Sequence, residues 1–121
     1  MFERPLFERY TFVMVTTQNL ASARKFWVEQ LGFPVTEDRP GESFIVDAGG
    51  LRLWIDLKDN EEKTIRGSDP AIGLKVRSVE MVLNALAARG ITEKAEPLAA
   101  NTGLYAIIHD RDGRAVVLTE T

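Results

Sequence analysis

The side chains able to carry out chemistry are few and scattered. The chain has one histidine, His109, and no cysteine, which excludes disulfides, thiolate metal ligands and a cysteine nucleophile. Histidine is the usual general acid or base near neutral pH, and Lys75 and Asp56 are the other candidates for that role. His109 comes directly before a turn, a place where a structural or surface histidine is the commoner case. Acid–base catalysis therefore rests on three candidates.

The stretch 10–33 contains the elements that must position such residues. An apolar strand is expected over 10–17, followed by a helix that Asn19 can cap with its side chain and that Gly32 can end. Apolar residues recur at helical spacing and predict a helix with one face against a sheet. These residues are Leu20, Ala23, Phe26, Trp27 and Leu31.

Three further strands and a polar segment follow the first helix. A Pro-Gly pair predicts a turn over 38–42, and Gly49 with Gly50 predicts a hairpin turn. The polar segment has no hydrophobic period and is interpreted as an exposed linker. The strands are expected over 34–37, 43–48 and 51–57, and the linker over 58–69.

The second half of the chain repeats this order. A strand leads into a helix that Ser78 can cap and Gly90 can end, and Asp110 and Asp112 are typical formers of the last turn. The strands of this half are expected over 70–77, 92–96, 103–109 and 114–119.

The repeat predicts the fold class. Two modules, 10–57 and 70–119, each read as one strand, one helix and three strands. A module of this kind leaves a sheet edge open, so two modules are expected to pair edge to edge. We expect one α+β domain over 1–121, with two βαβββ modules forming an eight-stranded, U-shaped open sheet around a cleft. The helices are expected on the convex side.

Composition excludes several classes of partner. The net charge is -3, the sequence pI is about 5.2, and the basic residues are scattered, so neither nucleic acid nor a membrane surface is an expected partner. No apolar run approaches the roughly 20 residues of a membrane span. Residues 1–9 are too charged for a signal peptide, and a cytoplasmic protein is expected. The apolar residues among 1–7 fit an arm that packs on the domain or on a second subunit.

Two motifs resemble the vicinal oxygen chelate superfamily, which includes glyoxalase I, extradiol dioxygenases, fosfomycin-resistance transferases and bleomycin-resistance proteins. The first is NLASARKFW, from Asn19 to Trp27, with LGF at 31–33, and it is similar to the family pattern DL..S..FY...LGF. The second is DRDG, from Asp110, followed by VVL, and it is similar to DPDG..IEL. With the repeat, the resemblance covers nearly the whole chain and implies the paired-module fold.

The same resemblance argues against a metal. Enzymes of the superfamily bind a divalent metal through His and Glu side chains on the first and last strands of each module. Phe12, Trp54, Ala71 and Val117 stand at those positions, and none can ligate a metal. A shift of two residues at Trp54 would bring only Asp56 there. Lewis-acid chemistry needs such ligands, so neither metal nor cofactor is expected, and the resemblance implies binding more than catalysis.

Strand alternation predicts which side chains face the cleft. In 51–57, Arg52 and Asp56 are placed on the cleft side because burying them under a helix without partners would be costly. Ile45 is likewise expected to point away from the helices. The predicted ligand-binding residues are Phe12, Met14, Asp47, Arg52, Trp54, Asp56, Lys75, Tyr105, Ile107, His109 and Val117.

Three functions follow as hypotheses. The first is a metal-independent protein that binds an aromatic or hydrophobic small molecule, such as an antibiotic, as a homodimer; metal-free members of the superfamily of the bleomycin-resistance type sequester a drug in this way. Aromatic side chains with a few charges suit such a site. The second is a glyoxalase-like lyase or another enzyme using Lys75, His109 or Asp56 as acid or base. The third is a regulatory module with a vestigial cleft, in which Trp54 only fills space.

Overall fold

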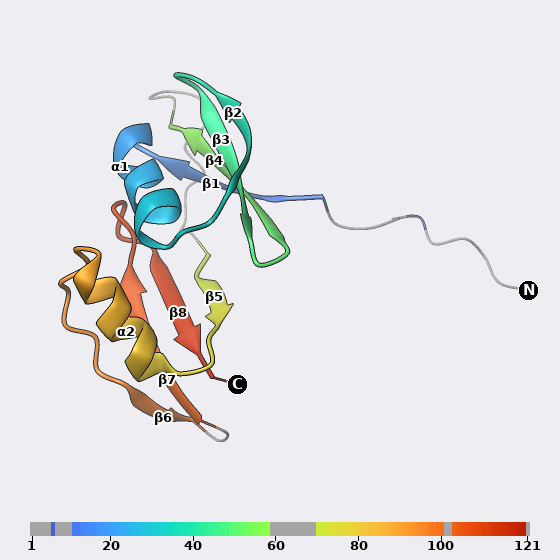
Figure 1. Cartoon of the computed structure of the whole chain (residues 1–121). Coiled ribbons are helices and arrows are strands. Elements are labelled where there is room, and N and C mark those ends of the chain that lie inside the picture. The colour runs from blue at the N-terminus through green and yellow to red at the C-terminus, as the bar shows by residue number, and fades with distance from the viewer. Residues whose placement is uncertain (1–5, 7–10, 59–69, 101–102, 121) are drawn as a thin grey trace, which may run out of the picture.

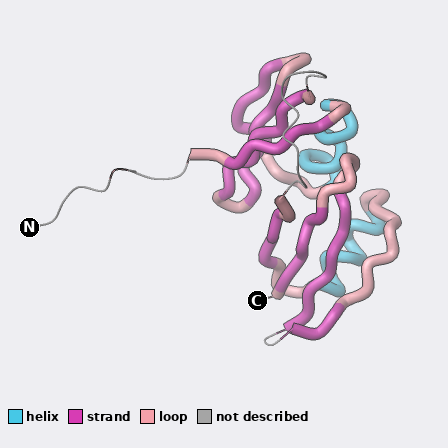
Figure 2. The backbone as a smooth tube through the Cα atoms, turned by 180° about the vertical axis from the view of Figure 1, so that it is seen from behind, coloured by secondary structure: helices cyan, strands magenta, loops and turns pink. Residues whose placement is uncertain are grey.

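Two four-stranded sheets, each with helix on one face, make up the molecule (Figure 1). The computed structural model describes residues 6, 11–58, 70–100 and 103–120. The strand order is β1-β4-β3-β2 in the first sheet and β5-β8-β7-β6 in the second. Seen from the front and from behind, both helices lie on the same side of the molecule, and the sheets lie on the other (Figures 1 and 2).

The two modules have the same topology. In each, the first strand pairs in parallel with the last, and the remaining neighbours pair antiparallel. The elements of the first module are β1 (Val13–Thr17), α1 (Leu20–Arg24), its π-helical continuation η1 (Lys25–Gln30), β2 (Val35–Arg39), β3 (Ser43–Ala48) and β4 (Leu51–Leu57). Those of the second are β5 (Ile72–Lys75), α2 (Val79–Ala88), β6 (Leu98–Ala100), β7 (Gly103–His109) and β8 (Ala115–Thr119). This confirms the predicted α+β class and its βαβββ modules, with the strands divided between two sheets.

The predicted helix caps are present. Asn19 accepts a hydrogen bond from the Ser22 backbone N–H at 3.0 Å, and Ser78 accepts one from Met81 at 3.3 Å. Gly32 and Gly90 end the helices with φ of 83° and 95°, which a residue without Cβ adopts readily. The first helix is one residue longer between cap and glycine, and its π-helical segment takes up that residue.

The core lies between the helices and the sheets. Phe26 and Trp27 of η1 are 2% and 1% exposed and pack edge to face, with ring centres 5.1 Å apart. In β4, Leu53 and Ile55 on the helix side are fully buried while Arg52 is exposed, as the alternation predicts. The other fully buried core residues come from both modules: Phe44, Val46, Leu53, Ile55, Val79, Ile108 and Val116.

Two sequence expectations are wrong. No strand forms over 92–96 in the described chain; β6 begins at Leu98, after Pro97. The Glu93 carboxylate accepts the backbone N–H of His109 and so takes the place of a strand partner at that end of β7. The turn expected over 38–42 narrows to 40–42, because β2 continues through Arg39 to the proline, which has no N–H to donate. Most of the expected linker, 59–69, lies outside the described residues.

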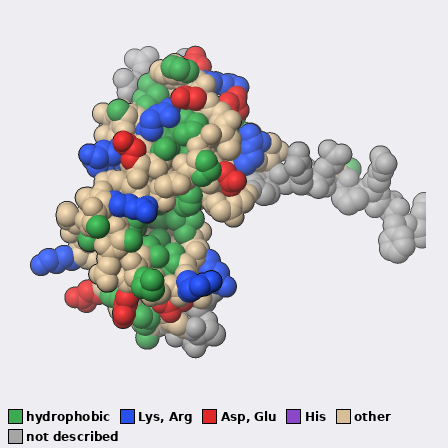
Figure 3. Space-filling view, in the orientation of Figure 1, with side chains coloured by type: hydrophobic (Ala, Val, Ile, Leu, Met, Phe, Trp, Pro, Cys, Tyr) green, Lys and Arg blue, Asp and Glu red, His purple; other side chains and the backbone are tan. Residues whose placement is uncertain are grey.

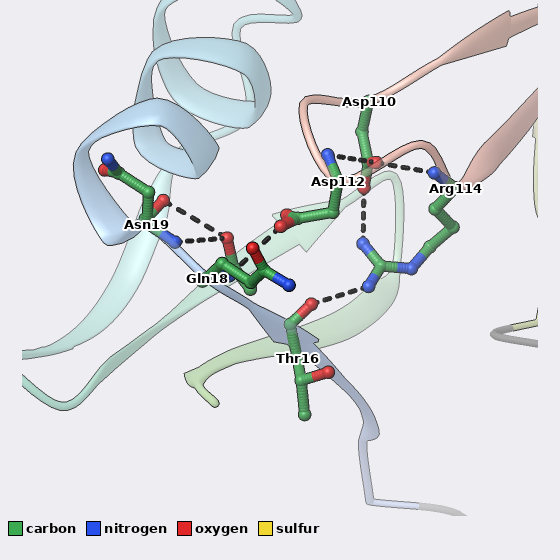
Figure 4. A network of polar contacts seen from close by, with 7 residues as sticks. Thr16, Gln18, Asn19, Asp110, Asp112 and Arg114 are labelled. Atoms are coloured by element: carbon green, nitrogen blue, oxygen red, sulfur yellow. Dashed lines mark hydrogen bonds and ion pairs between the residues drawn. The ribbon is translucent and has the colours of Figure 1, made fainter. Parts of the chain in front are cut away.

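The two modules are joined through a buried ion pair at the β7–β8 turn, whose arginine also bonds to β1 (Figure 4). The carboxylate of Asp110 binds the guanidinium of Arg114, and both side chains are 1% exposed. The same guanidinium donates to the Thr16 carbonyl at the end of β1 at 2.6 Å. Beside it, Asp112 accepts the Gln18 backbone N–H at 3.0 Å. The β7–β8 turn is thereby fixed to the exit of β1.

A second contact joins the ends of the two helices. The Gln30 side chain donates to the Arg89 carbonyl at 3.1 Å, and the Arg89 guanidinium donates to the Gln30 carbonyl at 2.9 Å. These reciprocal bonds, together with the ion pair, form what we call the seam between the modules.

Removing one member of the ion pair should destabilise the fold strongly. Asp110→Ala leaves the Arg114 charge buried without its carboxylate, and we expect a loss of about 3–5 kcal/mol in the free energy of unfolding by urea denaturation. The double variant Asp110→Ala/Arg114→Leu removes both charges and should lose no more than about 2 kcal/mol. A loss in the double variant equal to the sum of the losses in Asp110→Ala and Arg114→Leu would contradict this account.

Glu120 gives the fold a dependence on pH. Its carboxylate accepts the backbone N–H groups of Val79, at the start of α2, and of Leu104, at 2.9 and 3.1 Å. These bonds hold the pKa of Glu120 below its ordinary value of 4.5. Because the folded state favours the ionised form, this stabilisation is present above pH 4.5 and is lost as the pH falls through the lowered pKa.

Glu120→Gln should therefore flatten the acid limb of the stability profile. Urea denaturation between pH 7 and pH 3 should show a smaller acid-induced loss of stability in the variant than in the unmodified protein. If the free energy of unfolding falls equally steeply in both proteins below pH 4.5, the ionised Glu120 carboxylate is not stabilised by folding.

Candidate functional site

Trp54 is the centre of the sheet face that the first helix does not cover. It lies in β4, in register with Met14 of β1 and Ile45 of β3. The Phe12 ring packs against it at 4.9 Å between ring centres, tilted by 53°. The guanidinium carbon of Arg39 lies 5.5 Å from the indole centre, within the range of a cation–π contact. Trp54, Phe12 and Arg39 form what we call the aromatic face.

The indole N–H of Trp54 is buried and has no hydrogen-bond partner among the described residues. Leaving a buried donor unsatisfied costs about 1–3 kcal/mol. Such groups are rare in folded proteins, and each calls for an acceptor or an explanation. An acceptor from outside the described chain would satisfy it.

Large apolar side chains remain exposed on the uncovered faces of both sheets. Phe12 and Met14 are each 42% exposed on the first sheet, and Ile107 is 41% exposed on the second. Ile107 is in register with Val117, which is half-buried, as is Tyr105. The predicted apolar residues are thus grouped by sheet, and their exposure leaves them accessible to a ligand or a partner.

The predicted charged residues have separate environments. Asp47 accepts the Gly50 N–H at 2.7 Å and so closes its own turn. Arg52 is exposed, and Asp56, four residues further along the same strand, is half-buried. Neither Arg52 nor Lys75 forms an ion pair with a residue in the described ranges.

The three candidates for acid–base chemistry lie apart. Lys75 lines a cavity of about 540 Å³ between the modules. His109 lines a separate hollow of about 300 Å³, where its ring nitrogen Nδ1 is 3.0 Å from the Glu93 carboxylate. Asp56 lines neither space. Neither of these two spaces, as lined by the described residues, brings the three side chains together.

Sequence reasoning missed two residues beside Trp54. Arg39 was assigned to a turn, yet it is the last residue of β2 and reaches the indole. Ile45 was expected to face away from the helices and is nevertheless 3% exposed, because it lies between Trp54 and Glu37 in the register of the sheet. Arg39 pairs with Ser43, which lies on the same side of β3 as Ile45. Extending the alternation of side chains from β3 to its partner β2 would therefore have placed Arg39 on this face.

The positions at which the superfamily's enzymes hold their metal do not fit one here. Phe12 and Trp54 present aromatic rings in mutual contact, and Ala71 and Val117 present only hydrocarbon. Among the described residues no group of three or more His, Asp or Glu side chains could hold a metal ion. The side chains at these positions can therefore stack on a ligand and make a few polar contacts, and they do not support a metal-dependent step.

Two paired βαβββ modules with an uncovered sheet face define a class of small α+β proteins. A match between the sequence and a family model identifies the family within that class. The chain belongs to the Glyoxalase/Bleomycin resistance protein/Dioxygenase superfamily, whose family model matches residues 9–118. No curated protein matches the chain. No helix in the described ranges is long and apolar enough to cross a membrane.

Solved structures share this fold at low sequence identity. TnmS3, an antibiotic-binding protein from Streptomyces sp. CB03234, superposes with a TM-score of 0.75 at 22% identity, covering 96% of this chain and 98% of that one. UcmS2 gives 0.78 at 21% identity, covering 96% and 100%. A lactoylglutathione lyase from Agrobacterium tumefaciens gives 0.72 at 13% identity, covering 94% of each chain. The fold is common to a binding protein and a lyase.

Replacing Trp54 by phenylalanine should cost the free protein little. The change keeps an aromatic ring and removes a buried donor for which the described part of the chain offers no partner, so we expect the free energy of unfolding to stay within about 1 kcal/mol of the unmodified protein. Urea denaturation of the ligand-free protein measures this. A loss of more than about 2 kcal/mol would show that the N–H is already satisfied in the folded protein.

Proposed function

We propose that this protein binds an aromatic or hydrophobic small molecule, such as an antibiotic, at the aromatic face and without a metal. The observation that carries the proposal is the buried N–H of Trp54, which has no hydrogen-bond partner within the described ranges and lies beside the exposed ring of Phe12. An aromatic ligand with a carbonyl or hydroxyl oxygen would stack on these rings and accept that hydrogen bond.

The neighbours of Trp54 support an aromatic ligand. Exposed Met14 adds a flexible, polarisable side chain, which adapts to ligands of varied shape. Arg39 adds a planar cation that can stack on a ring or pair with a polar substituent. Its ion pair with Glu37, at 3.1 Å, is exposed and therefore weak, so Arg39 is available to reorient.

The structural relatives support binding without deciding it. TnmS3 is described as an antibiotic-binding protein, whereas the Agrobacterium protein is described as a lyase. At 22% and 13% identity these likenesses establish the fold alone. The choice between the two functions rests on the residues of this chain.

Acid–base catalysis is the second hypothesis, and the geometry favours it less. Shared catalysis would require the candidates to meet at one substrate. Lys75 and His109 line different spaces, and His109 is paired with Glu93 outside the aromatic face. The His109–Glu93 pair alone favours a lyase-like activity, which would require its substrate in the smaller hollow.

We further propose that the two modules act as one domain and that two copies form a homodimer. The seam supports the first statement, because Arg114 of a buried ion pair in one module donates a hydrogen bond to the Thr16 carbonyl of the other. For the second, Leu6 is 93% exposed, and Phe12 and Met14 are partly exposed on the uncovered sheet face. A second copy would cover such surface. The dimer and a cytoplasmic location stay predictions.

Binding should depend on Trp54 and Phe12 and persist in EDTA. In a screen of aromatic antibiotics, a ligand should raise the melting temperature by mass action. Trp54→Ala should then weaken the Kd about 10- to 100-fold through lost stacking and burial, with Trp54→Phe in between. Isothermal titration calorimetry measures each Kd.

Met81→Ala is the matched control, because Met81 is 71% exposed on α2, away from the aromatic face, and its loss should leave the Kd unchanged. The proposal fails if Trp54→Ala and Phe12→Ala bind like the unmodified protein, or if binding requires an added divalent metal.

A further inference from the structure

A second space lies between the modules, apart from the aromatic face. It has a volume of about 540 Å³, within the roughly 300–1,000 Å³ of small-molecule pockets. Its walls come from the end of the first helix, the tip of the β3–β4 hairpin, β5 and α2. In Figure 3, hydrophobic side chains gather near the narrowing between the two halves. The apolar walls include Leu31, Phe33, Leu51, Val82, Leu86 and Leu118.

The register of the sheets shows why this space is open. Ala48 and Leu51 form the last pair of the β3–β4 hairpin. The corresponding last pair of the β7–β8 hairpin is Asp110 and Arg114, whose backbones bond at 3.0 Å. Arg114 and Asp110 form the ion pair of the seam, whereas Ala48 and Leu51 have no polar side-chain atom.

The strands that these hairpins approach also correspond. Thr16 of β1 and Lys75 of β5 each precede a helix cap, Asn19 and Ser78, by the same number of residues. Arg114 binds the Thr16 carbonyl, which closes one side of the seam. At the corresponding side, Leu51 and Lys75 both line the cavity instead. The two modules are therefore joined tightly on one side and stand apart on the other.

The charged groups at the cavity are both cations. Lys75 and Arg89 line it, and among the residues that the structure describes no carboxylate does. Arg89 is held in place by its bond to the Gln30 carbonyl at 2.9 Å, and Lys75 has no ion-pair partner in the described ranges. In a chain of net charge -3, two cations beside an apolar cavity favour a ligand that combines hydrocarbon with one negative charge.

We propose that this cavity is a second ligand site, which takes an amphipathic carboxylate such as a fatty acid. The hydrocarbon lies along the leucines and Phe33, and the carboxylate lies between Lys75 and Arg89. The site shares no lining residue with the aromatic face, so it does not depend on the function proposed for Trp54.

Trp27 provides a reporter for this site. It stacks on Phe33, a wall of the cavity, at 6.3 Å between ring centres. The chain has two tryptophans, so the Trp54→Phe variant has Trp27 as its only indole fluorophore. Titrating that variant with decanoate should change the Trp27 emission saturably, and calorimetry gives the Kd and stoichiometry.

Two variants and two matched controls test the location. Ala85 lines the cavity from α2, and Ala85→Leu should fill it and weaken decanoate binding more than tenfold. Ala87 is exposed on the same helix and does not line the cavity, so Ala87→Leu should bind normally. Lys75→Met should weaken binding about tenfold by removing a cation, whereas Lys94→Met, at an exposed position elsewhere, should not.

The ligand's charge is tested with decanol and decyltrimethylammonium. Both should bind at least tenfold more weakly than decanoate, because neither pairs with the two cations. Circular dichroism tests whether each variant is folded. Val82→Phe, which changes another cavity residue, is the second blocking variant and replaces Ala85→Leu if that variant does not fold. The proposal is overturned if decanoate shows no saturable binding, if both blocking variants bind normally, or if decanol binds as well as decanoate. Loss of antibiotic binding in Trp54→Ala with decanoate binding intact separates the two sites.

Discussion

The buried pair of Asp110 and Arg114 is the constraint on which the arrangement of the two modules depends. A guanidinium this deeply buried must have its charge neutralised and its N–H groups bonded; the Asp110 carboxylate neutralises the charge, and that carboxylate and the Thr16 carbonyl accept hydrogen bonds from its two terminal nitrogens. Because Thr16 belongs to one module and the ion pair to the other, satisfying Arg114 joins the two sheets at a fixed place. The planar donors of arginine suit this bridge better than a lysine ammonium would.

The same topology is used twice with different hairpin chemistry. One module places a carboxylate and a guanidinium at its last hairpin, and the other places Ala48 and Leu51 there. The first choice seals the modules together and the second leaves a cavity. The aromatic face around Trp54 lies elsewhere, on the sheet surface away from the helix. One fold thus offers an aromatic sheet face and, separately, a hydrophobic cavity lined by two cations.

Local sequence patterns predicted the parts of the fold that local physics decides. The side chains of Asn19 and Ser78 cap helices by accepting hydrogen bonds from backbone N–H groups of the first turn, and Gly32 takes a left-handed conformation. All three can therefore be recognised from the local sequence. Alternation placed the buried and exposed sides of β4 for the same reason. The Arg114 bond to Thr16 joins residues 98 positions apart, and no local pattern encodes it. Arg39 was missed because the proline after it predicted a turn too early, and β6 was misplaced because Glu93 replaces a strand partner through its side chain.

The most direct test of the central claim follows the two indole N–H signals by nuclear magnetic resonance. The ¹⁵N-labelled protein would be titrated with an antibiotic from the screen, in EDTA, with the signals assigned by Trp54→Phe. The account predicts a large downfield shift of the Trp54 indole proton as its N–H gains an acceptor, with the Trp27 signal, buried in the core, nearly unmoved. An unmoved Trp54 signal at saturation, or a shift that appears only after a divalent metal is added, would contradict it.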